Sequence, residues 1–545
     1  MTNPPNLHLS EDLARPDAER VTVHTPRHGS VTGRRARNGA VVFLEVPYAL
    51  PPVRFSNPQP LPDSYRYEDE KKEFVHEFAY AVQPGNDGQS VGISRKDHLG
   101  LGEPSENPLF VNIVLPPAFN NQSSPPLSES ATKRFPVRIY IHGGFLQFGS
   151  PHSLGSQAQY VAAERNEIWV NVGYRLSAFG FLACDAPTKI DGNFGFKDQW
   201  LALEWVRENI EAFGGDVDDI QVTGLSAGAH SVHQILHHAS RLPAGKKAPF
   251  TSAMLQSNAM VSVPKTPSEL RPQFEALCTA LSLDPQAPDV LETLRDPSKV
   301  TWESIVKAIE EERLGPYGTF RGALDGEWLA SEPDPMTWQR SGGFADGLRK
   351  AGVKYLIVGD LSEEWYLYAI AHPITTPADV KENLYRYYPE SIVHALLEVY
   401  DAKSVLENAS AEKCVEFFGR VAADMQVHVP VRMFARDLER SGFPVLRYSI
   451  RWTPEQIREM YKGYVTHATD RVLWCYREPI LTKEQLAVAR EWLDIVDSES
   501  RAIANGLKKN PDEALVLNED KSISWRKDAQ WDELLRVAKI LPGEN

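Results

Sequence analysis

The sequence predicts an α/β fold with a central, mostly parallel sheet, helices on both of its faces and a helical cap. Short apolar runs alternate with helical patterns through the middle of the 545-residue chain, as expected for parallel strands joined by crossover helices. Residues 266–317 and 373–427 instead carry little strand signal and many helical stretches. We expect these two segments to form a cap over the carboxyl ends of the strands, where open α/β sheets bind their ligands.

The strands are expected in chain order. Residues 21–25 and 40–46 are alternating or apolar runs between turn residues, which predicts an N-terminal β-meander. The strands expected after it cover residues 109–115, 137–141, 168–172, 220–223, 253–256, 355–358 and 445–450. Residues 116–133 are predicted to be a polar surface insertion, and residues 483–505 a helix followed by a charged tail. All of these elements are assigned to one domain, residues 21–545.

Composition and charge are typical of a soluble globular protein. Hydrophobic residues make up 42% of the chain and charged residues 24%, which is sufficient for a core of ordinary size. The formal net charge of −15 argues against nucleic acid or an anionic membrane as a partner. No apolar run reaches the length that a membrane span needs.

The first residues and the cysteines bear on the cellular compartment. Residues 1–20, which we expect to be an N-terminal tail, lack the basic and apolar regions of a secretory signal. The cysteines Cys184, Cys278, Cys414 and Cys475 lie far apart in the chain, so we expect free thiols rather than a disulfide framework. Both observations favour an intracellular, cytoplasmic location.

A candidate nucleophile follows the strand expected at residues 220–223. The pentapeptide Gly224-Leu225-Ser226-Ala227-Gly228 stands between that strand and a helical pattern, which is the context of a nucleophile elbow with an exposed serine hydroxyl. The glycines leave room for the sharp turn, because a Cβ at either position would collide with the neighbouring strand or helix. Ser226 is therefore the predicted nucleophile.

The stretch from Asn209 to Gly228 resembles the signature of the type-B carboxylesterases, the family that also contains the cholinesterases. The matching pieces are ENIEAFGGD and GLSAG, preceded by GNFGFKDQWLALEWV. Further landmarks are FLEVPYALPPVRFSNPQPL near the start and VTHATDRVLW near the end, so the resemblance spans roughly residues 21 to 500. It implies the α/β-hydrolase fold and serine-dependent ester hydrolysis. Where secreted relatives have Glu-Asp-Cys-Leu, this chain has Glu-Asn-Pro-Leu at residues 106–109 and so lacks the cysteine of a disulfide.

A serine nucleophile needs a base, and the base needs an orienting acid. In α/β-hydrolases the acid follows the nucleophile in the chain and precedes the histidine. The strand expected at residues 355–358 runs into Asp360, Glu363 and Glu364, and composition alone does not separate these three carboxylates. The family resemblance implies Glu364, because the family pattern GxxxxEG falls on that residue.

The base is expected in the loop after the strand at residues 445–450. His467 has this position, and it matches the family pattern of a histidine followed by a small residue and then an acid. The other histidines after Glu364 are His372, His394 and His428; His428 lies in a helical, proline-terminated pattern that looks structural. Asp470 is expected to fix the loop rather than to act as the triad acid.

Acyl transfer also needs donors for the developing oxyanion. The strand at residues 137–141 runs into His142-Gly143-Gly144-Phe145, so the backbone N–H groups of Gly144, Phe145 and Ala227 are the predicted oxyanion hole. Relatives usually have a third glycine where Phe145 stands. The Phe145 N–H can still donate, provided that the ring points away from the substrate.

The predicted substrate pocket contains Leu225, Tyr317, Phe320 and Trp365. Cholinesterase-like relatives usually have glutamate before the nucleophile, and Leu225 removes that negative charge. Tyr317 and Phe320 fall where the family builds its acyl pocket, and Trp365, which replaces a usual glycine, would wall the site or re-aim its loop. Arg321 could meet a substrate carboxylate, but we expect it to be solvated or structural. The sequence thus predicts neutral, fairly apolar esters with a medium or bulky acyl group, and no preference for choline esters.

Four histidines follow the elbow: His230, His233, His237 and His238. No carboxylate or cysteine completes a ligand set nearby, so we expect packing or surface roles and no metal. No cofactor is expected either.

Three functions are compatible with these residues. The leading hypothesis is a serine carboxylic-ester hydrolase that acts through an acyl-enzyme on a small-molecule ester. The same site could serve a transacylase, lactonase or cyclase, in which an alcohol, an amine or an internal nucleophile resolves the acyl-enzyme. A non-catalytic binding protein is the third hypothesis, but such relatives lack a triad member, whereas Ser226, Glu364 and His467 are all present. The sequence does not indicate the oligomeric state.

Overall fold

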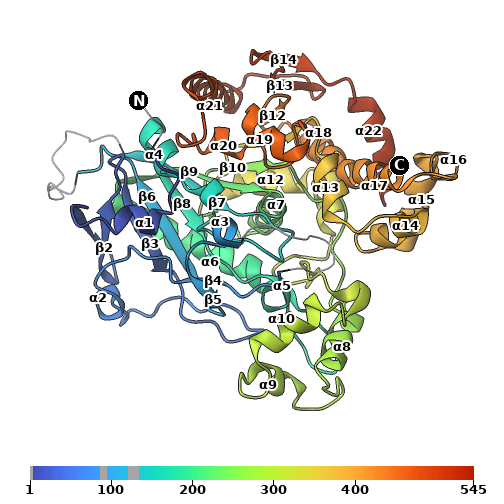
Figure 1. Cartoon of the computed structure of the whole chain (residues 1–545), viewed down its shortest axis with the longest axis horizontal. Helices are drawn as coiled ribbons and strands as arrows, with labels where there is room; N and C mark the ends of the chain where they lie inside the picture. Colours follow the sequence, from blue (N-terminus) through green and yellow to red (C-terminus); the bar gives the residue numbers. More distant parts are fainter. Residues whose placement is uncertain (1–3, 86–94, 121–133, 545) are drawn as a thin grey trace.

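A twisted sheet of twelve strands runs through the centre of the computed structural model, which describes residues 4–85, 95–120 and 134–544 (Figure 1). The strand order is β1-β2-β3-β6-β8-β7-β9-β10-β11-β12-β13-β14. The strands are β1 Arg20–Thr25, β2 Gly29–Arg35, β3 Val41–Pro47, β6 Phe110–Leu115, β7 Phe135–Ile141, β8 Ile168–Val172, β9 Gly215–Leu225, β10 Ser252–Gln256, β11 Tyr355–Leu361, β12 Val445–Ile450, β13 Glu513–Leu517 and β14 Ile523–Lys527. The pair β4 Ala79–Ala81 and β5 Glu103–Ser105 forms a separate small parallel sheet.

The run from β8 to β13 is parallel, whereas β1, β2, β3 and β6 at one edge and β14 at the other pair antiparallel with their neighbours. Parallel strands need crossover connections, and helices provide them here. This arrangement confirms the predicted fold class. The carboxyl ends of β9, β10 and β11 lie level with one another, because Gln256 pairs with both Leu225 and Gly359.

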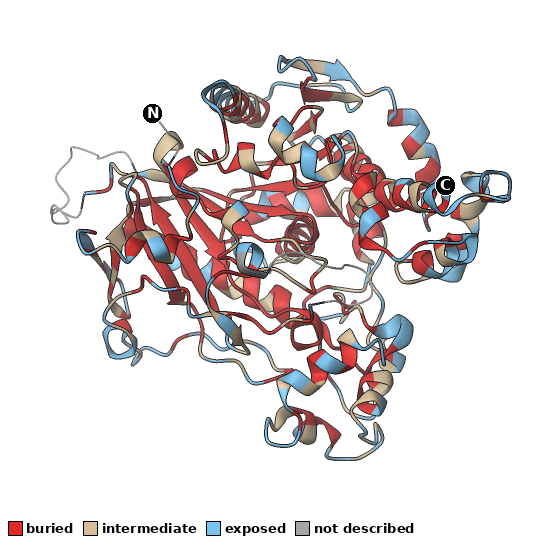
Figure 2. Ribbon diagram, in the orientation of Figure 1, coloured by how far each residue is buried: buried red, intermediate tan, exposed pale blue. Residues whose placement is uncertain are grey.

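Helices cover both faces of the sheet, and the strands between them are buried (Figure 2). Side chains alternate between two hydrophobic clusters, as period-two strands require: in β11, Leu356 and Val358 belong to one cluster, and Ile357 and Leu361 to the other. The first cluster contains residues of α5 Ser177–Phe181, α6 Phe194–Asn209, α7 Ala227–Ala239, α12 Gly343–Ala351, α18 Val429–Arg440 and α22 Trp531–Ala538. The second contains residues of α1 Leu9–Leu13, α4 Gln159–Arg165, α20 Arg471–Trp474 and α21 Lys483–Ala504.

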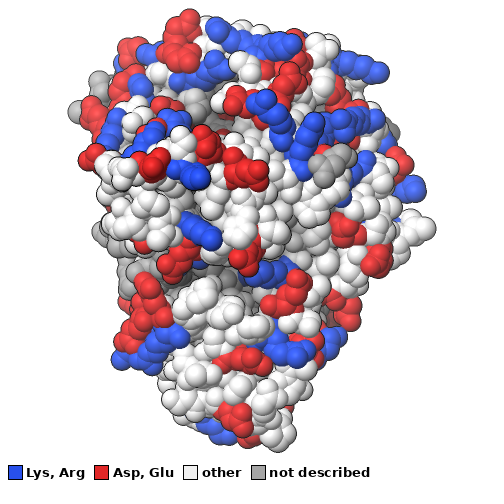
Figure 3. Space-filling view, turned by 90° about the vertical axis from the view of Figure 1, so that its right-hand side faces the viewer, with Lys and Arg blue, Asp and Glu red and all other residues white. Residues whose placement is uncertain are grey.

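The two segments expected to form the cap are helical. The first holds α8 Arg271–Ala280, α9 Val290–Arg295 and α10 Trp302–Glu310, and the second holds α14 Pro377–Tyr385, α15 Glu390–Val399, α16 Ala402–Val405 and α17 Ala411–Ala423. They lie at the lower right and at the right of Figure 1, beyond one end of the sheet. Seen from that side, the surface carries interspersed charges of both signs and is hollowed between its upper and lower parts (Figure 3).

The remaining helices are short. They are α2 Tyr67–Glu70, α3 Arg95–Leu99, α11 Pro335–Arg340, α13 Trp365–Ala371 and α19 Glu455–Arg458. A π-helix, Asp424–His428, joins α17 to α18. No helix in the described part of the chain combines the length and the apolarity that crossing a membrane requires.

Three expectations about the ends of the chain and the loops need correction. The segment at residues 4–20, expected to be part of an N-terminal tail outside the domain, packs on it, because Leu9 and Leu13 of α1 are buried in the second cluster. The charged C-terminal tail instead forms β13 and β14, which complete one edge of the sheet, and α22, which packs in the first cluster. The β-meander contains β2, which was not expected because its Gly- and Arg-rich sequence carries little strand signal. The predicted insertion at residues 116–133 falls largely outside the described residues.

Candidate active site

Ser226 stands at the turn between β9 and α7, where its backbone has φ 59° and ψ −125°. A residue other than glycine rarely adopts a positive φ, and holding it there costs about 1–3 kcal/mol. Both flanking glycines are required by close packing. A Cβ on Gly224 would lie 2.2 Å from the Gly228 carbonyl carbon, and one on Gly228 would lie 2.1 Å from the Ile141 oxygen. The turn thus has the geometry of a nucleophile elbow.

His467 and Glu364 form a buried hydrogen-bonded pair. The Nδ1 atom of His467 lies 2.6 Å from Oε2 of Glu364, and the second carboxylate oxygen accepts the backbone N–H of Leu361 at 3.0 Å. The Nε2 atom of His467 is buried and has no hydrogen-bond partner among the described residues. An imidazole held through Nδ1 by a carboxylate, with Nε2 free, is arranged to exchange a proton with a further group.

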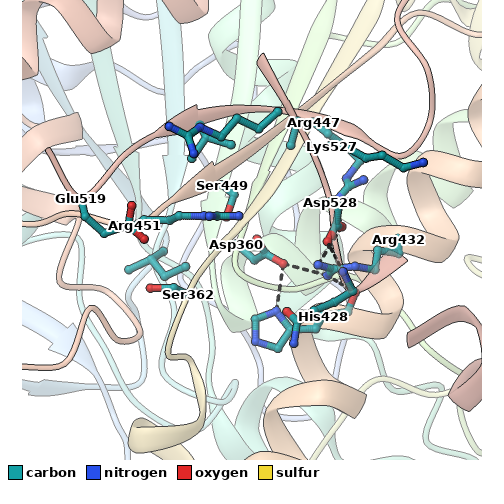
Figure 4. Close-up of a pocket in the computed structure, with 15 residues that line it drawn as sticks. Asp360, Ser362, His428, Arg432, Arg447, Ser449, Arg451, Glu519, Lys527 and Asp528 are labelled. Carbon is teal, nitrogen blue, oxygen red and sulfur yellow. Dashed lines mark hydrogen bonds and ion pairs between the residues drawn. The ribbon is translucent and has the colours of Figure 1, made fainter. Parts of the chain in front are cut away.

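Asp360, the alternative acid, belongs to a different network (Figure 4). Its Oδ2 lies 2.9 Å from Nδ1 of His428 and 3.0 Å from the Arg432 guanidinium. Burial would raise the Asp360 pKa, but Arg432 and His428 outweigh it and lower that pKa. Burial alone would likewise lower the pKa of His428, yet the bond to Asp360 raises it. The raised pKa favours the protonated form of His428, and only the neutral form accepts a proton from a serine, which argues against His428 as the base.

The loop after β7 presents the backbone groups expected to form the oxyanion hole. Gly144 and Phe145 both have a positive φ, at 112° and 56°. A Cβ on the preceding Gly143 would lie 3.0 Å from Cβ of Ser226, so this loop passes directly beside the elbow. Among the backbone hydrogen bonds of the described turns, loops and helix ends, none is donated by the N–H of Gly144, Phe145 or Ala227. Unpaired N–H groups beside a nucleophile are what an oxyanion hole requires.

The Phe145 ring is turned toward α13. It packs edge-on against Tyr368, with the ring centroids 6.4 Å apart, and Tyr368 in turn packs against His467 at 6.4 Å. Tyr368 follows Glu364 by one helical turn, a spacing that places it on the same side of α13. The ring of Tyr368 therefore joins the His467 loop to the Phe145 loop.

A buried glutamine joins the Phe145 loop to the segment expected to form the acyl pocket. The Nε2 atom of Gln147 donates to the carbonyl oxygens of Phe145, at 3.0 Å, and Phe320, at 2.5 Å. Its Oε1 accepts the N–H of Phe320 at 3.2 Å. Gln147 and Phe320 are both fully buried. The predicted pocket segment is thus anchored beside the candidate oxyanion hole.

Comparison with known proteins assigns the chain to a family. A family model described as the carboxylesterase family matches residues 17–526. The chain belongs to the carboxylesterase family. This confirms the resemblance seen in the sequence and makes the chain a carboxylic ester hydrolase.

Several relatives span most of this carboxylesterase-family chain. An uncharacterized esterase/lipase of Schizosaccharomyces pombe is 30% identical over 525 residues, which are 92% of each chain. Para-nitrobenzyl esterase of Bacillus subtilis is 28% identical over 455 residues, 79% of each chain. A solved structure of a PNB esterase superposes with a TM-score of 0.70 at 24% identity, covering 95% of this chain and 99% of that one. At that identity the superposition shows the shared fold.

The four residues predicted to line the pocket do not form one cluster. Phe320 is buried in the first hydrophobic cluster, whereas Leu225 packs in the second, on the opposite face of the sheet. Trp365 packs against Tyr464, with ring centroids 5.0 Å apart, and under the Arg420 guanidinium. Tyr317 is 39% exposed. Their roles toward a substrate stay predictions.

The histidines after the elbow have protein partners. His233 bonds Gln339 at 2.8 Å and accepts the Met260 N–H at 2.8 Å, and His238 bonds the Trp328 carbonyl at 2.8 Å. Burial lowers the pKa of His230 to about 4 and that of His233 to about 3. His237 has no hydrogen-bond partner among the described residues, and its ring packs against those of His233 and Phe344. All four cysteines of the chain are buried and unpaired.

Sequence reasoning missed Tyr368 and Gln147. The signal for Tyr368 was its position one helical turn after the candidate acid, and the signal for Gln147 was a polar residue inside an otherwise apolar loop. Neither feature indicates which residues Tyr368 and Gln147 contact, because most of those residues lie far away in sequence.

Proposed function

We propose that this carboxylesterase-family chain hydrolyses esters through a covalent acyl-enzyme on Ser226, with His467 as general base and Glu364 as the acid that orients it. The observation that carries the proposal is the buried pair of His467 and Glu364, in which Nδ1 is occupied at 2.6 Å and Nε2 has no described partner. Such a pair fixes the tautomer that can accept a serine proton at Nε2.

The proposed reaction has two halves. The Ser226 oxygen attacks the ester carbonyl while His467 Nε2 takes its proton, and the N–H groups of Gly144, Phe145 and Ala227 stabilise the oxyanion. The intermediate collapses, and the alcohol leaves with the proton from His467. Water then gives a proton to His467 and attacks the acyl carbon, and the collapse of this second intermediate releases the acid and restores Ser226. An acceptor alcohol or amine in place of water would give acyl transfer, which product analysis with and without added acceptors distinguishes.

For the substrate, the sequence favours neutral, fairly apolar esters and no preference for choline esters. Phe320 is a buried apolar side chain next to the Gln147 bridge, which supports an apolar surrounding for the part of a substrate that reaches it.

A serine-directed organophosphate tests the nucleophile. We expect intact-mass analysis to show one adduct on the wild type and none on Ser226→Ala, with turnover reduced by more than about a thousandfold in that variant. Ser522→Ala, in the turn between β13 and β14, is the matched control and should label and turn over like the wild type. The same adduct on Ser226→Ala would overturn the assignment.

A further inference from the structure

Arg321 is a cation whose charge the described residues leave uncompensated. It is half-buried, and its Nε and Nη2 atoms are buried without any hydrogen-bond partner. Its guanidinium stacks on the ring of Tyr387, with Cζ 4.5 Å from the ring centroid. The stacking satisfies the face of the guanidinium but not its N–H donors, which point outward in the plane of the group.

Among the described residues, the titratable side chains whose pKa the charge of Arg321 shifts include no carboxylate. The positive charge of Arg321 acts on His230, Tyr368, His372 and Tyr388. Burial is the main cause that lowers the pKa of both histidines to about 4, and burial raises the pKa of both tyrosines. These four side chains are therefore neutral near pH 7. Buried guanidinium nitrogens without a hydrogen-bond acceptor are costly unless a ligand supplies one.

Two chains of contacts place Arg321 beside the candidate site. On one side, Tyr387 hydroxyl lies 2.9 Å from Nε2 of His372, and His372 packs against Tyr368, which contacts His467. On the other side, Arg321 directly follows Phe320, which Gln147 ties to Phe145.

The backbone of Arg321 is fixed from both directions. Gln147 bonds the N–H and the carbonyl of Phe320, and Asn193 bonds the N–H and the carbonyl of Ala323, each at 2.8 Å. A Cβ on Gly322 would lie 2.4 Å from the Phe196 ring, so the chain is tightly held there too. A charged group on a rigid segment is preorganised for a ligand.

We propose that Arg321 binds a carboxylate carried by the substrate ester, so that the enzyme selects esters with an anionic group. Two N–H donors in one plane match the two oxygens of a carboxylate. This inference rests on the proposed function, and it replaces the expectation of a solvated or structural Arg321. The preference for neutral, apolar groups, which the sequence predicts, then applies only to the parts of the substrate that do not reach Arg321.

The acyl part or the alcohol part of the ester could carry the carboxylate, and two substrate pairs separate these sources. The first pair is the monoethyl ester of adipic acid and ethyl adipamate, in which a primary amide replaces the carboxylate. The second pair is the butyryl ester of γ-hydroxybutyrate and that of γ-hydroxybutyramide. Each pair differs in charge but hardly in size, so the ratio of kcat/KM within a pair reports recognition of the charge.

We expect the wild type to favour the carboxylate by at least about tenfold in one pair. Arg321→Met should lose that preference, and Arg321→Lys, which keeps the charge without the planar fork, should retain part of it. Arg313→Met removes an exposed arginine of the same connecting segment, paired with Glu311, and should keep the wild-type ratio. The inference is overturned if the wild type shows no preference in either pair, or if Arg321→Met has the wild-type ratios.

A binding measurement separates this inference from the proposed function. Calorimetric titration of adipate into the Ser226→Ala protein should show binding that is lost when Arg321→Met is added. Full ester turnover by Ser226→Ala would refute the proposed nucleophile, but adipate binding would still test whether Arg321 binds a carboxylate. Equal adipate binding with and without Arg321 would refute the carboxylate site even if Ser226 proves catalytic.

Discussion

The Nδ1 atom of His467 lies 2.6 Å from a carboxylate oxygen of Glu364, whereas the carboxylate of the adjacent Glu363 accepts the backbone N–H of Val465, at 2.8 Å. The two neighbouring carboxylates therefore predict different mutational effects. Glu364→Gln should reduce kcat/KM by about a thousandfold or more, because an amide neither holds the required tautomer nor stabilises the imidazolium.

Glu363→Gln is the matched control for this prediction, since it changes one atom at the next position. A glutamine oxygen can still accept the Val465 N–H, so we expect a loss of less than about tenfold. Equal, mild losses in both variants would move the acid elsewhere, and Asp360 would be the next residue to test.

The Gln147 bridge predicts a loss that depends on the acyl group. Gln147→Met removes the side-chain amide that holds Phe145 and Phe320 together, and the freed backbone groups cost about 1–3 kcal/mol each if they stay buried and unpaired. We expect a lower melting temperature and a kcat/KM reduced by at least about tenfold. The ratio of activities on short and long acyl esters should also change. A variant with wild-type kcat/KM on every chain length would show that the bridge does not position the site.

Asp470 predicts a pH-dependent stability. Burial raises its pKa from 3.8 to about 6; the bond from the Trp474 indole at 2.8 Å opposes this, and the charge of Glu364 adds to it. Because the folded state binds the proton more tightly, the stabilising contribution is present below the unfolded pKa and is lost as pH rises through about 6.

Asp470→Asn removes this titration and keeps an oxygen for Trp474. We compare the free energies of unfolding of the variant and the wild type by urea denaturation. The difference, variant minus wild type, should increase by up to about 3 kcal/mol from about pH 4 to about pH 8. The same difference at both pH values would contradict the raised pKa. Asp437→Asn is an unsuitable control, because burial raises the Asp437 pKa too; the exposed Asp520 is suitable.

The charge around the site predicts poor use of choline esters. Leu225 stands before the nucleophile where a carboxylate would attract a cation, and Arg321 adds a positive charge near the candidate site. We expect kcat/KM for butyrylcholine to be no higher than for its neutral carbon isostere. A clearly higher value for butyrylcholine would refute this prediction.

The sequence by itself determined the fold class and the candidate reacting residues. Apolar runs that alternate with helical patterns predict parallel strands, and the glycine spacing around Ser226 predicts a sharp turn. Both predictions succeed because a strand and a turn each depend on residues that are close together in the sequence. The structure matches the expected central strands within a few residues and has the expected turn at Ser226. The weak β2 sequence and the charged sequence of β14 do not predict strands, because such segments owe their structure to the neighbouring strands they pair with.

The tertiary structure alone decided which distant side chains meet. Composition could not separate Glu364 from Glu363 and Asp360, which are within five residues of one another, whereas the fold pairs them with His467, Val465 and His428, respectively. It also separated Leu225 from Phe320, and it stacked Arg321 on Tyr387 with two nitrogens that have no partner among the described residues. A sequence records which charged residues exist. Whether a charge is balanced by a partner depends on its burial and on its distance from residues remote in sequence, and only folding sets that burial and those distances.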